Sequence, residues 1–368
     1  MSSTCVSSTC MQNTGKLSGK LVPNRYAVLN SRVLARAGLM VAGLVVGSSA
    51  LAQNQVTLTA SNWLAPTHTL SMTQAKWCDE VTKATSSRVK CNILPKAVAA
   101  PPGTFDAVRD GLADLAYTVH GYTPGRFLMT QMAELAFLGD NAEATSVAYQ
   151  RVYERHMAAL NEHKGVKVIA VFTHGPGNIF NTKKSIQSTA DLQGLKFRVG
   201  GGMVNEIGKS LGMNVTLKPA PESYELLSSG VMDGVLFPSE SVEAFKLDKL
   251  VKHRTSFAGG LYNTSFVFMM NEATWAKIGK DDQAAITKLS GEYAARLFGR
   301  GWDSVDRRGI ALMQANNVQQ VVASAAFVKE VKEKTGLLEG KWAKDSGAKG
   351  LANPEQVLKE FRAEIAKN

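Results

Sequence analysis

The sequence predicts an α/β protein with a largely parallel sheet. Short β-rich runs alternate with stretches of helical periodicity along most of the chain, which is the pattern of βαβ units. One long apolar run, residues 262–271, fits a strand buried on both faces, as strands of parallel sheets are. The 368 residues are 45% hydrophobic and 20% charged, which is typical of globular proteins, and the length suits about two domains.

The first half of the chain predicts four strands and two helices. Val56–Ala60 alternates polar and apolar residues as a strand does, and a proline-containing loop follows at Trp63–His68. The other strands of this half are Arg88–Leu94, Asp114–Val119 and Val166–Phe172, and the helices are Leu70–Ala84 and Thr104–Leu112.

The second half begins in the same way and then becomes helical. Strands are expected at Lys196–Val199, Gly234–Phe237 and Tyr262–Asn271, with helices at Val204–Leu211 and Ser223–Ser229 between them. Beyond the last strand the periodicity predicts the helices Ala276–Arg300, Ser304–Ala315, Ala325–Thr335 and Pro354–Lys367. No flexible linker interrupts the sequence, so a crossing between two domains has to run through ordered segments.

The first 52 residues have the composition of a secretory signal peptide. They hold five basic and no acidic residues, and the apolar run 37–52 ends on Ala50-Leu51-Ala52, a small-x-small cleavage pattern. We expect cleavage after Ala52 and a mature protein in the periplasm. The alternative is a membrane anchor, but the apolar run is shorter than the about 20 residues that a spanning helix needs. The remainder has 37 basic and 31 acidic residues, an excess too small to indicate a nucleic-acid partner.

Export changes the interpretation of the cysteines. Cys5 and Cys10 leave with the signal peptide, and Cys78 and Cys91 remain as an even pair in an oxidising compartment. We expect a disulfide between Cys78 and Cys91, worth about 3 kcal/mol in the chain-entropy description. Two buried thiols are the alternative.

No catalytic or cofactor motif is complete. Gly200–Gly202 stands between an expected strand and an expected helix, but Asn205 occupies the third glycine position of a dinucleotide-binding fingerprint. The six histidines lack metal-ligand spacing, and no G-x-S-x-G elbow is present. We therefore expect no enzyme activity, no cofactor and no metal. The glycine triplet fits either an anion site at a helix N-terminus or a tight turn with positive φ.

Arg198 is the strongest candidate for a binding residue. It lies near the carboxyl end of the expected strand Lys196–Val199, the end at which open α/β sheets place their ligands. A guanidinium there can hold a carboxylate through two parallel hydrogen bonds. The alternative is a surface arginine paired with a nearby acid.

Four motifs of the mature chain resemble those of one transport family. They are Asp106–Leu115 (DAVRDGLADL), Asp191–Val199 (DLQGLKFRV), Tyr224–Leu227 (YELL) and Gly230–Gly234 (GVMDG). In order and spacing they are similar to those of the solute-binding proteins of tripartite ATP-independent periplasmic (TRAP) transporters, the DctP family. The resemblance covers essentially the whole mature chain.

The resemblance implies a two-domain periplasmic-binding-protein-like α/β fold, with hinge strands and a long helix that touches both domains. We expect domain I at residues 53–174 with 264–303, and domain II at residues 175–263 with 304–368. The resemblance also implies that Arg198 binds the carboxylate of an organic acid, that the protein is a monomer, and that a TRAP membrane permease receives the ligand unchanged. A periplasmic enzyme acting on organic acids and a ligand-sensing subunit of a membrane receptor are the alternatives.

Two departures from the family pattern bear on the ligand. Phe237 stands where the family commonly has a polar residue, and Thr173–Asn178 lacks the second basic residue that is frequent there. Both favour a monocarboxylate with an apolar or aromatic body, against which Phe237 can stack. Other expected ligand-binding residues come from loops near the ends of predicted strands: Trp63, His68, His120, Tyr122, His174, Glu240 and Asn263.

Overall fold

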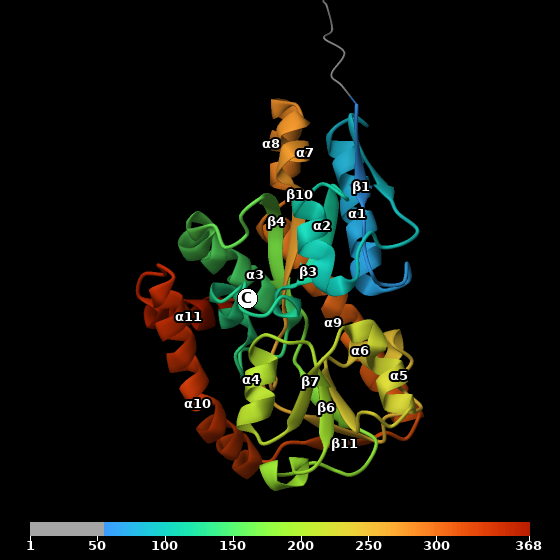
Figure 1. Cartoon of the computed structure of the whole chain (residues 1–368), viewed down its shortest axis with the longest axis vertical. Coiled ribbons are helices and arrows are strands. Elements are labelled where there is room, and N and C mark those ends of the chain that lie inside the picture. Colours follow the sequence, from blue (N-terminus) through green and yellow to red (C-terminus); the bar gives the residue numbers. More distant parts are fainter. Residues whose placement is uncertain (1–54) are drawn as a thin grey trace, which may run out of the picture. The chain divides into compact units, whose positions relative to one another are not determined.

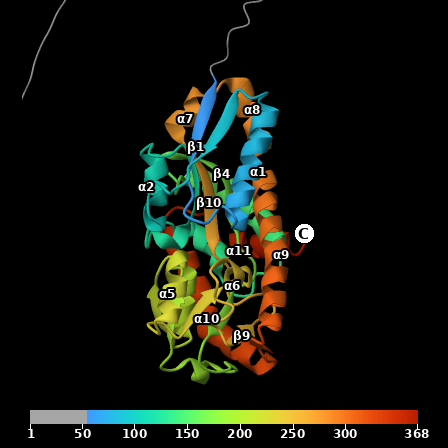
Figure 2. The same ribbon diagram turned by 90° about the vertical axis from the view of Figure 1, so that its right-hand side faces the viewer.

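A computed structural model describes residues 55–368 of the chain (Figure 1). The predicted signal peptide, its cleavage after Ala52, and Cys5 and Cys10 lie outside the described residues. The described part contains two β-sheets with helices packed around them, as Figure 2 also shows from the side. None of its helices combines the length and the apolar composition that a membrane crossing needs.

The first sheet has five strands in the order β2-β1-β3-β10-β4. They are β1 (Val56–Ala60), β2 (Val89–Ile93), β3 (Leu115–Val119), β4 (Val166–Thr173) and β10 (Ser265–Asn271). β1 pairs in parallel with β2 and β3, whereas β10 is antiparallel to β3 and β4. Every residue of β10 is buried, as the apolar run predicts, although the strand begins at Ser265 rather than at Tyr262.

The second sheet has six strands in the order β11-β9-β5-β8-β6-β7. They are β5 (Asn178–Asn181), β6 (Lys196–Val199), β7 (Asn214–Leu217), β8 (Gly234–Phe237), β9 (His253–Ser256) and β11 (Gln319–Val322). β5 is antiparallel to β8 and β9, while the other pairs of this sheet are parallel.

Both sheets are largely parallel, as the sequence predicts, but each contains one reversed strand. The reversed strands are β5 and β10, and both follow a crossing of the chain between the sheets. β4 leads directly into β5, and β9 leads through residues 257–264 into β10. Each runs antiparallel to its neighbours in the sheet that it enters.

The helices between the strands include two, α3 and α6, that the sequence did not predict. They are α1 (Thr69–Ala84), α2 (Thr104–Arg109), α3 (Ala142–Val152), α4 (Met203–Ser210), α5 (Ser223–Ser228) and α6 (Glu240–Ala244). Of the two unpredicted helices, α3 is buried along most of its length, and its N-cap Asn141 accepts a hydrogen bond from the backbone of Ala144.

The helices after β10 differ from the predicted ones in their boundaries. They are α7 (Glu272–Lys277), α8 (Lys280–Lys288), α9 (Glu292–Ala315), α10 (Ala325–Ala348) and α11 (Pro354–Ile365). The predicted helix 276–300 is interrupted at Gly279 and at Gly291, whose φ is +59°. α9 continues through Gly301 without a break. A glycine suits this position because α1 lies so close that a Cβ would approach Thr73 Oγ1 to 3.0 Å.

α9 is the long helix that contacts both sheets. In its first half, the ring of Phe298 stacks on Phe172 of β4, with 4.2 Å between the ring centroids. In its second half, Gly309 lies against the backbone of Ser239 before α6, and a Cβ there would come within 2.2 Å of the Ser239 carbonyl oxygen. The single helix α9 thus supports elements of both sheets.

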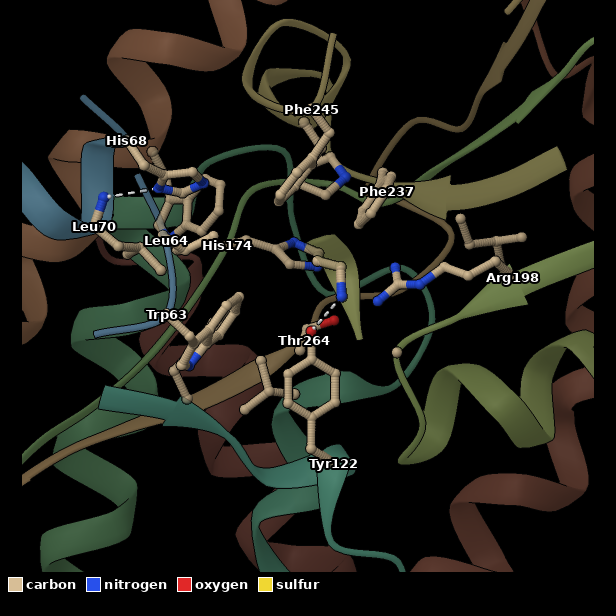
Figure 3. Close-up of a pocket in the computed structure, with 18 of the residues that line it drawn as sticks. Trp63, Leu64, His68, Leu70, Tyr122, His174, Arg198, Phe237, Phe245 and Thr264 are labelled. Atoms are coloured by element: carbon tan, nitrogen blue, oxygen red, sulfur yellow. Dashed lines mark hydrogen bonds between the residues drawn. The ribbon is translucent and has the colours of Figure 1, made fainter. Parts of the chain in front are cut away.

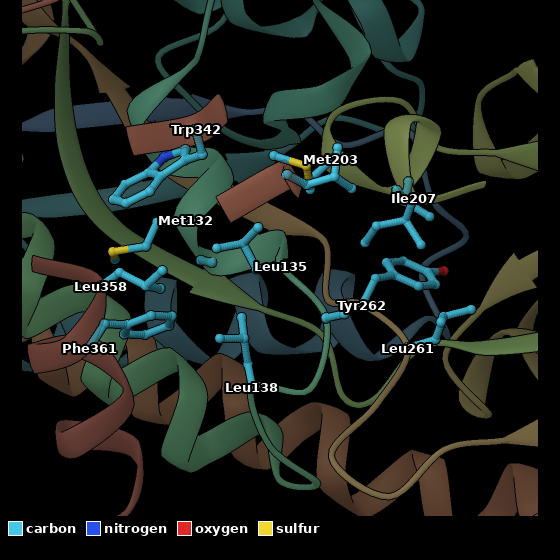
Figure 4. Close-up of a cluster of buried hydrophobic side chains, with 14 of the residues drawn as sticks. Met132, Leu135, Leu138, Met203, Ile207, Leu261, Tyr262, Trp342, Leu358 and Phe361 are labelled. Atoms are coloured by element: carbon cyan, nitrogen blue, oxygen red, sulfur yellow. The ribbon is translucent and has the colours of Figure 1, made fainter. Parts of the chain in front are cut away.

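A large hydrophobic core also joins elements of the two sheets (Figure 4). Met132, which follows β3, packs in the same core as Met203 of α4, and the Nε1–H of Trp342 in α10 donates to the carbonyl of Met129 at 3.1 Å. α11 packs against α3, with Phe361 beside the ring of Tyr149. The C-terminal helices contact elements on both sides, and the domain boundaries given above stay a prediction.

The structure joins Cys78 of α1 to Cys91 of β2 by a disulfide, with 5.7 Å between the Cα atoms. The bond ties the helix to the edge strand of the first sheet.

Candidate functional site

A cavity lies between the two sheets, and residues from both form its wall (Figure 3). It contains about 450 Å³ of space not filled by atoms, including space open to solvent. Six of the residues expected from the sequence to bind ligand line it: Trp63, His68, Tyr122, His174, Arg198 and Phe237. The loops after β1, β3 and β4 and the strands β6 and β8 bring them together.

Arg198 is the positive charge of this cavity. Its side chain is almost completely buried, and its Nε donates to the carbonyl oxygen of Lys218 at 2.7 Å. The ring of Phe237 lies under the guanidinium, with 4.5 Å from Cζ to the ring centroid. Burial lowers the pKa of Arg198, but from so high an ordinary value that the group stays positive at neutral pH. No carboxylate in residues 55–368 forms an ion pair with it, so the alternative of a surface arginine paired with an acid was wrong.

Aromatic rings form most of the remaining wall. Trp63 lies 5.7 Å from Tyr122 between ring centroids, and Phe237 stacks on Phe245 at 5.4 Å. The hydroxyl of Tyr122 accepts a hydrogen bond from the backbone N–H of Ala220 at 2.9 Å, which connects the loop after β3 to the loop after β7. The contacts of Phe237 are thus with Arg198 and Phe245, and its expected stacking against a ligand stays a prediction.

His174 brings a neutral imidazole to the cavity from the segment between β4 and β5. Its Nδ1 lies 2.5 Å from the carbonyl oxygen of Gly175, so Nδ1 carries the proton and donates it. Burial, with a smaller contribution from the nearby charge of Arg198, lowers the pKa of His174 to about 4. Asn263 fixes the backbone of this segment by donating to the carbonyls of His174 and Gly175, at 2.8 and 3.1 Å.

His68 and Glu240 form a buried contact between the sheets beside the cavity. His68 Nδ1 accepts from the backbone N–H of Leu70 as the N-cap of α1, which leaves the proton on Nε2, 3.1 Å from Glu240 Oε1. Burial lowers the pKa of His68 to about 4 and raises that of Glu240 to about 8. The contact is therefore a hydrogen bond between a neutral imidazole and a carboxyl group that burial keeps protonated. Asp306 of α9 accepts from the backbone N–H of Glu240 at 2.7 Å.

Three expected wall residues lie outside the cavity. His120 turns into the first-sheet side, where Nδ1 lies 3.0 Å from Ser265 Oγ and Nε2 lies 2.7 Å from His163 Nε2. The reason is that residues 120–122 form a 3₁₀ turn, which points His120 away from the side where Tyr122 lines the cavity. Asn263 supports the backbone behind His174, and Glu240 faces His68 rather than the cavity.

The glycine triplet after β6 forms a tight turn, and a carboxyl group of the chain itself lies at the helix N-terminus that follows it. Gly201 and Gly202 have φ of +80° and +68°, as one of the two interpretations requires. The side chain at the N-terminus of α4 is Glu134, whose Oε2 accepts from the backbone N–H of Met203 at 2.8 Å. Glu134 Oε1 accepts from the backbone and the hydroxyl of Ser265, at 3.0 and 2.7 Å, and burial raises the pKa of Glu134. Sequence analysis missed this role, because 69 residues separate the two ends of the bond.

Other wall residues also escaped the sequence analysis. Phe245, Thr264, Phe266 and Trp302 line the cavity, and Trp302 belongs to α9. Of these, Thr264 adjoins the expected residue Asn263, so the strand-end position was a usable signal for it. Trp302 had no usable signal in the sequence, because it lies between the two predicted helices 276–300 and 304–315, whereas the single helix α9 runs through this position.

Comparisons with known proteins agree with this architecture. Residues 60–345 match the family model of bacterial extracellular solute-binding proteins, family 7 (DctP). The outer membrane transporter protein TsaT of Comamonas testosteroni is 30% identical over 331 residues, which is 89% of this chain and 96% of that protein.

Solved structures with the same fold are TRAP periplasmic solute-binding proteins. One from Bordetella bronchiseptica, with bound (R)- and (S)-mandelate, is 44% identical with a TM-score of 0.83, and the match covers 85% of this chain and 99% of that one. A marine metagenome protein specific for aromatic acid ligands, in complex with 3-hydroxybenzoate, is 32% identical with a TM-score of 0.79 over 85% of this chain and 99% of that one. One from Rhodoferax ferrireducens, with copurified benzoate, is 31% identical with a TM-score of 0.79, covering 85% and 98%.

The chain therefore belongs to family 7 of the bacterial extracellular solute-binding proteins, the DctP family. The resemblance to TRAP solute-binding proteins and the two-domain α/β fold that it implied are confirmed. Proteins of this kind are periplasmic, and the family and the solved structures are of binding proteins rather than enzymes.

Proposed function

We propose that the protein binds an aromatic monocarboxylate in the periplasm and delivers it unchanged to the membrane permease of a TRAP transporter. The observation that carries this proposal is the environment of Arg198. Its Nε is engaged by Lys218, and the rest of its guanidinium points into an aromatic cavity without a carboxylate partner in the described residues (Figure 3). A buried cation of this kind is stabilised by an anionic ligand with matching geometry.

The wall of the cavity favours a single carboxylate on an aromatic body. Among the described residues that line it, Arg198 is the one lysine or arginine, and His68 and His174 are held neutral by burial. A second carboxylate would therefore be desolvated without a charged partner, which is costly. Rings such as Trp63 and Phe245 offer faces and edges to an aromatic ligand instead. The solved relatives with mandelate, 3-hydroxybenzoate and benzoate support this ligand class.

The proposed capture uses the hinge between the two domains. Because both sheets contribute to the wall, a bound ligand contacts both at once and favours the arrangement seen here over an opened one. We assign residues 53–174 with 264–303 to one domain and residues 175–263 with 304–368 to the other. Export with cleavage after Ala52 would place this closing protein beside the permease.

Calorimetric titration of the purified mature protein tests the ligand class and the role of Arg198. We expect benzoate and mandelate to bind more tightly than succinate and galactonate. Arg198→Lys removes the bidentate geometry and should weaken binding at least tenfold, about 1.4 kcal/mol or more. Arg254→Lys is the matched control, because Arg254 is a largely buried arginine of the second sheet that bonds Gln320 and Asn178 outside the cavity. Unchanged affinity in Arg198→Lys, or a preference for succinate, would refute the proposal.

Delivery is tested with the permease itself. Proteoliposomes containing the small and large membrane subunits of a TRAP permease from the same organism should take up labelled benzoate when the binding protein is added, and not without it. Nuclear magnetic resonance of the ligand released from the purified protein should show the intact acid. Conversion of the ligand would instead support the alternative of a periplasmic enzyme.

A further inference from the structure

We propose that the ligand carries a hydroxyl group on the carbon next to its carboxylate, and that His174 reads this hydroxyl by accepting its hydrogen bond at Nε2. This inference rests on the proposed function and narrows it to aromatic 2-hydroxy acids. Arg198 holds the carboxylate, and His174 is the specificity-determining residue.

The tautomer of His174 follows from its neighbour. The carbonyl oxygen of Gly175 can only accept a hydrogen bond, and it lies 2.5 Å from Nδ1, so Nδ1 carries hydrogen. A neutral imidazole has one such hydrogen, which leaves a lone pair on Nε2. Burial and the charge of Arg198 both disfavour a second proton and keep the pKa near 4. His174 can therefore only accept at Nε2.

The tautomer is held in place by the backbone around it. Asn263 donates to the carbonyls of His174 and Gly175, so the oxygen that faces Nδ1 is fixed. The α carbon of Gly175 lies so close to α9 that a Cβ would come within 2.2 Å of Asp306 Oδ2. The segment between β4 and β5 is thus packed on two sides, and the acceptor it presents is preorganised.

The acceptor at Nε2 has no hydrogen-bond partner in the described part of the chain, although His174 is only 4% exposed and lines the cavity. Its neighbours include the rings of Tyr262, Phe266 and Trp302, with centroids 5.4 to 6.3 Å away. A buried acceptor among rings is costly unless a donor reaches it. A carboxylate has only acceptors, so benzoate and phenylacetate leave Nε2 unpaired, whereas a hydroxyl group supplies the missing hydrogen.

The position of the hydroxyl follows from the nearness of Arg198. The charge of Arg198 acts on His174, and Figure 3 shows the guanidinium pointing toward His174 across the cavity. A carboxylate held by Arg198 therefore brings its adjacent carbon close to both groups. A hydroxyl on that carbon can reach Nε2, whereas a hydroxyl on the far side of the ring points to the aromatic wall at Trp63 and Phe245.

Two ligands that differ by one hydroxyl group test the inference. Mandelate and phenylacetate share the ring, the carboxylate and the carbon between them, and mandelate adds the hydroxyl. Titration calorimetry of the wild-type mature protein should give mandelate an affinity at least about tenfold above that of phenylacetate. In His174→Phe the ratio of the two affinities should fall to near one. His174→Gln, whose side-chain oxygen can replace Nε2 as acceptor, should restore part of the ratio. Since His174 stays neutral, the wild-type ratio should be the same at pH 6 and pH 8.

The outcomes separate this inference from the function on which it rests. Equal affinities for the two ligands in the wild-type protein, with Arg198→Lys weakening both, would overturn the role of His174 and leave the proposed function standing. A preference for mandelate that survives in His174→Phe would overturn it as well. Binding of neither ligand would refute both proposals together. Thermal unfolding would show whether each variant is folded. If one is not, the comparison of mandelate with phenylacetate in the wild-type protein still tests whether the hydroxyl group is preferred.

Discussion

Glu134 makes a buried contact between the two sheets whose loss should be visible in ligand binding. It follows β3 in the chain, whereas Met203 begins the helix after β6. Its Oε2 accepts from Met203 N–H and its Oε1 accepts twice from Ser265. The bond to Met203 therefore exists only while elements of the two sheets are held as they are here. In Glu134→Gln, an amide oxygen can keep the Ser265 bonds, but the amide nitrogen then faces the Met203 N–H, donor against donor.

The size of the effect follows from the kind of bond that is lost. A hydrogen bond to a charged group contributes about 1.5 to 3 kcal/mol, and the buried donor at Met203 is left without a partner. If this cost falls on the closed arrangement alone, ligand affinity drops by roughly 10- to 150-fold. Dissociation should account for most of the change, because the bond holds the cavity shut after the ligand has entered.

Stopped-flow dissociation and titration calorimetry with mandelate measure this effect, and Glu162→Gln is its control. Glu162 is a half-buried acid that also accepts backbone N–H groups, but its partners Leu128, Met129 and Thr130 all lie in the segment after β3. Both variants should lose stability in urea unfolding, and only Glu134→Gln should lose ligand affinity. The bridging role would be refuted if mandelate dissociated from Glu134→Gln at the wild-type rate, or if Glu162→Gln lost as much affinity as Glu134→Gln.

Three further results are expected. Replacing Cys78 and Cys91 by alanine should lower the free energy of unfolding by about 3 kcal/mol, as urea unfolding with and without reductant would show; equal stability would contradict this. Gly121→Ala would place a Cβ 2.7 Å from the backbone carbon of Gly201, which separates the two sheets at a cost of about 1 to 3 kcal/mol and weakens ligand binding in titrations; unchanged binding would show that the contact yields freely. The pKa of Glu240 is raised to about 8, so the folded protein keeps a proton that the unfolded carboxyl loses near its ordinary pKa of 4.5. This contribution to stability is complete below the unfolded pKa and disappears as pH rises through about 8; Glu240→Gln should flatten the decline between pH 6.5 and 8.5, and an unaltered slope would contradict it.

The sequence pattern was sufficient to predict the helices and strands in which apolar residues recur regularly. The buried strand β10 and the helix α1 were predicted with ends that differ by at most a few residues, because the five consecutive apolar residues Phe266–Met270 and a clear helical period leave little choice. The four-residue strands β5, β7, β9 and β11 were missed, whereas β6 and β8, which are equally short, were predicted, so a period over four residues is an unreliable signal. The reversed direction of β5 and β10 depends on where the chain crosses between sheets, which no local pattern encodes.

The residues of the site also include some that a local sequence signal predicted and some that it could not predict. Arg198, Tyr122 and His174 were found because they stand at or beside the carboxyl ends of strands, where ligand sites of α/β sheets lie. His120 has the same signal and still turns inward, since a 3₁₀ turn rather than an extended loop follows β3. Glu134 had no signal, because its function comes from partners 69 and 131 residues away in the chain.

The two acids that bridge the sheets explain how one small ligand can control the arrangement. Glu134 and Glu240 each make good hydrogen bonds, but burial raises the pKa of both, so desolvation cancels much of what the bonds contribute. Contacts of this kind define one closed geometry without making it much more stable than an open one. A ligand has to supply about 5.5 kcal/mol of differential binding to shift a population from 1:99 to 99:1. A charge-assisted carboxylate contact at Arg198 contributes about 1.5 to 3 kcal/mol, and an aromatic ring buried against Trp63 and Phe245 contributes a similar amount. Under the proposed function the sum reaches the required range only when the carboxylate and the ring are on the same molecule, so we expect closure to be selective for aromatic acids even though neither group alone would be bound strongly.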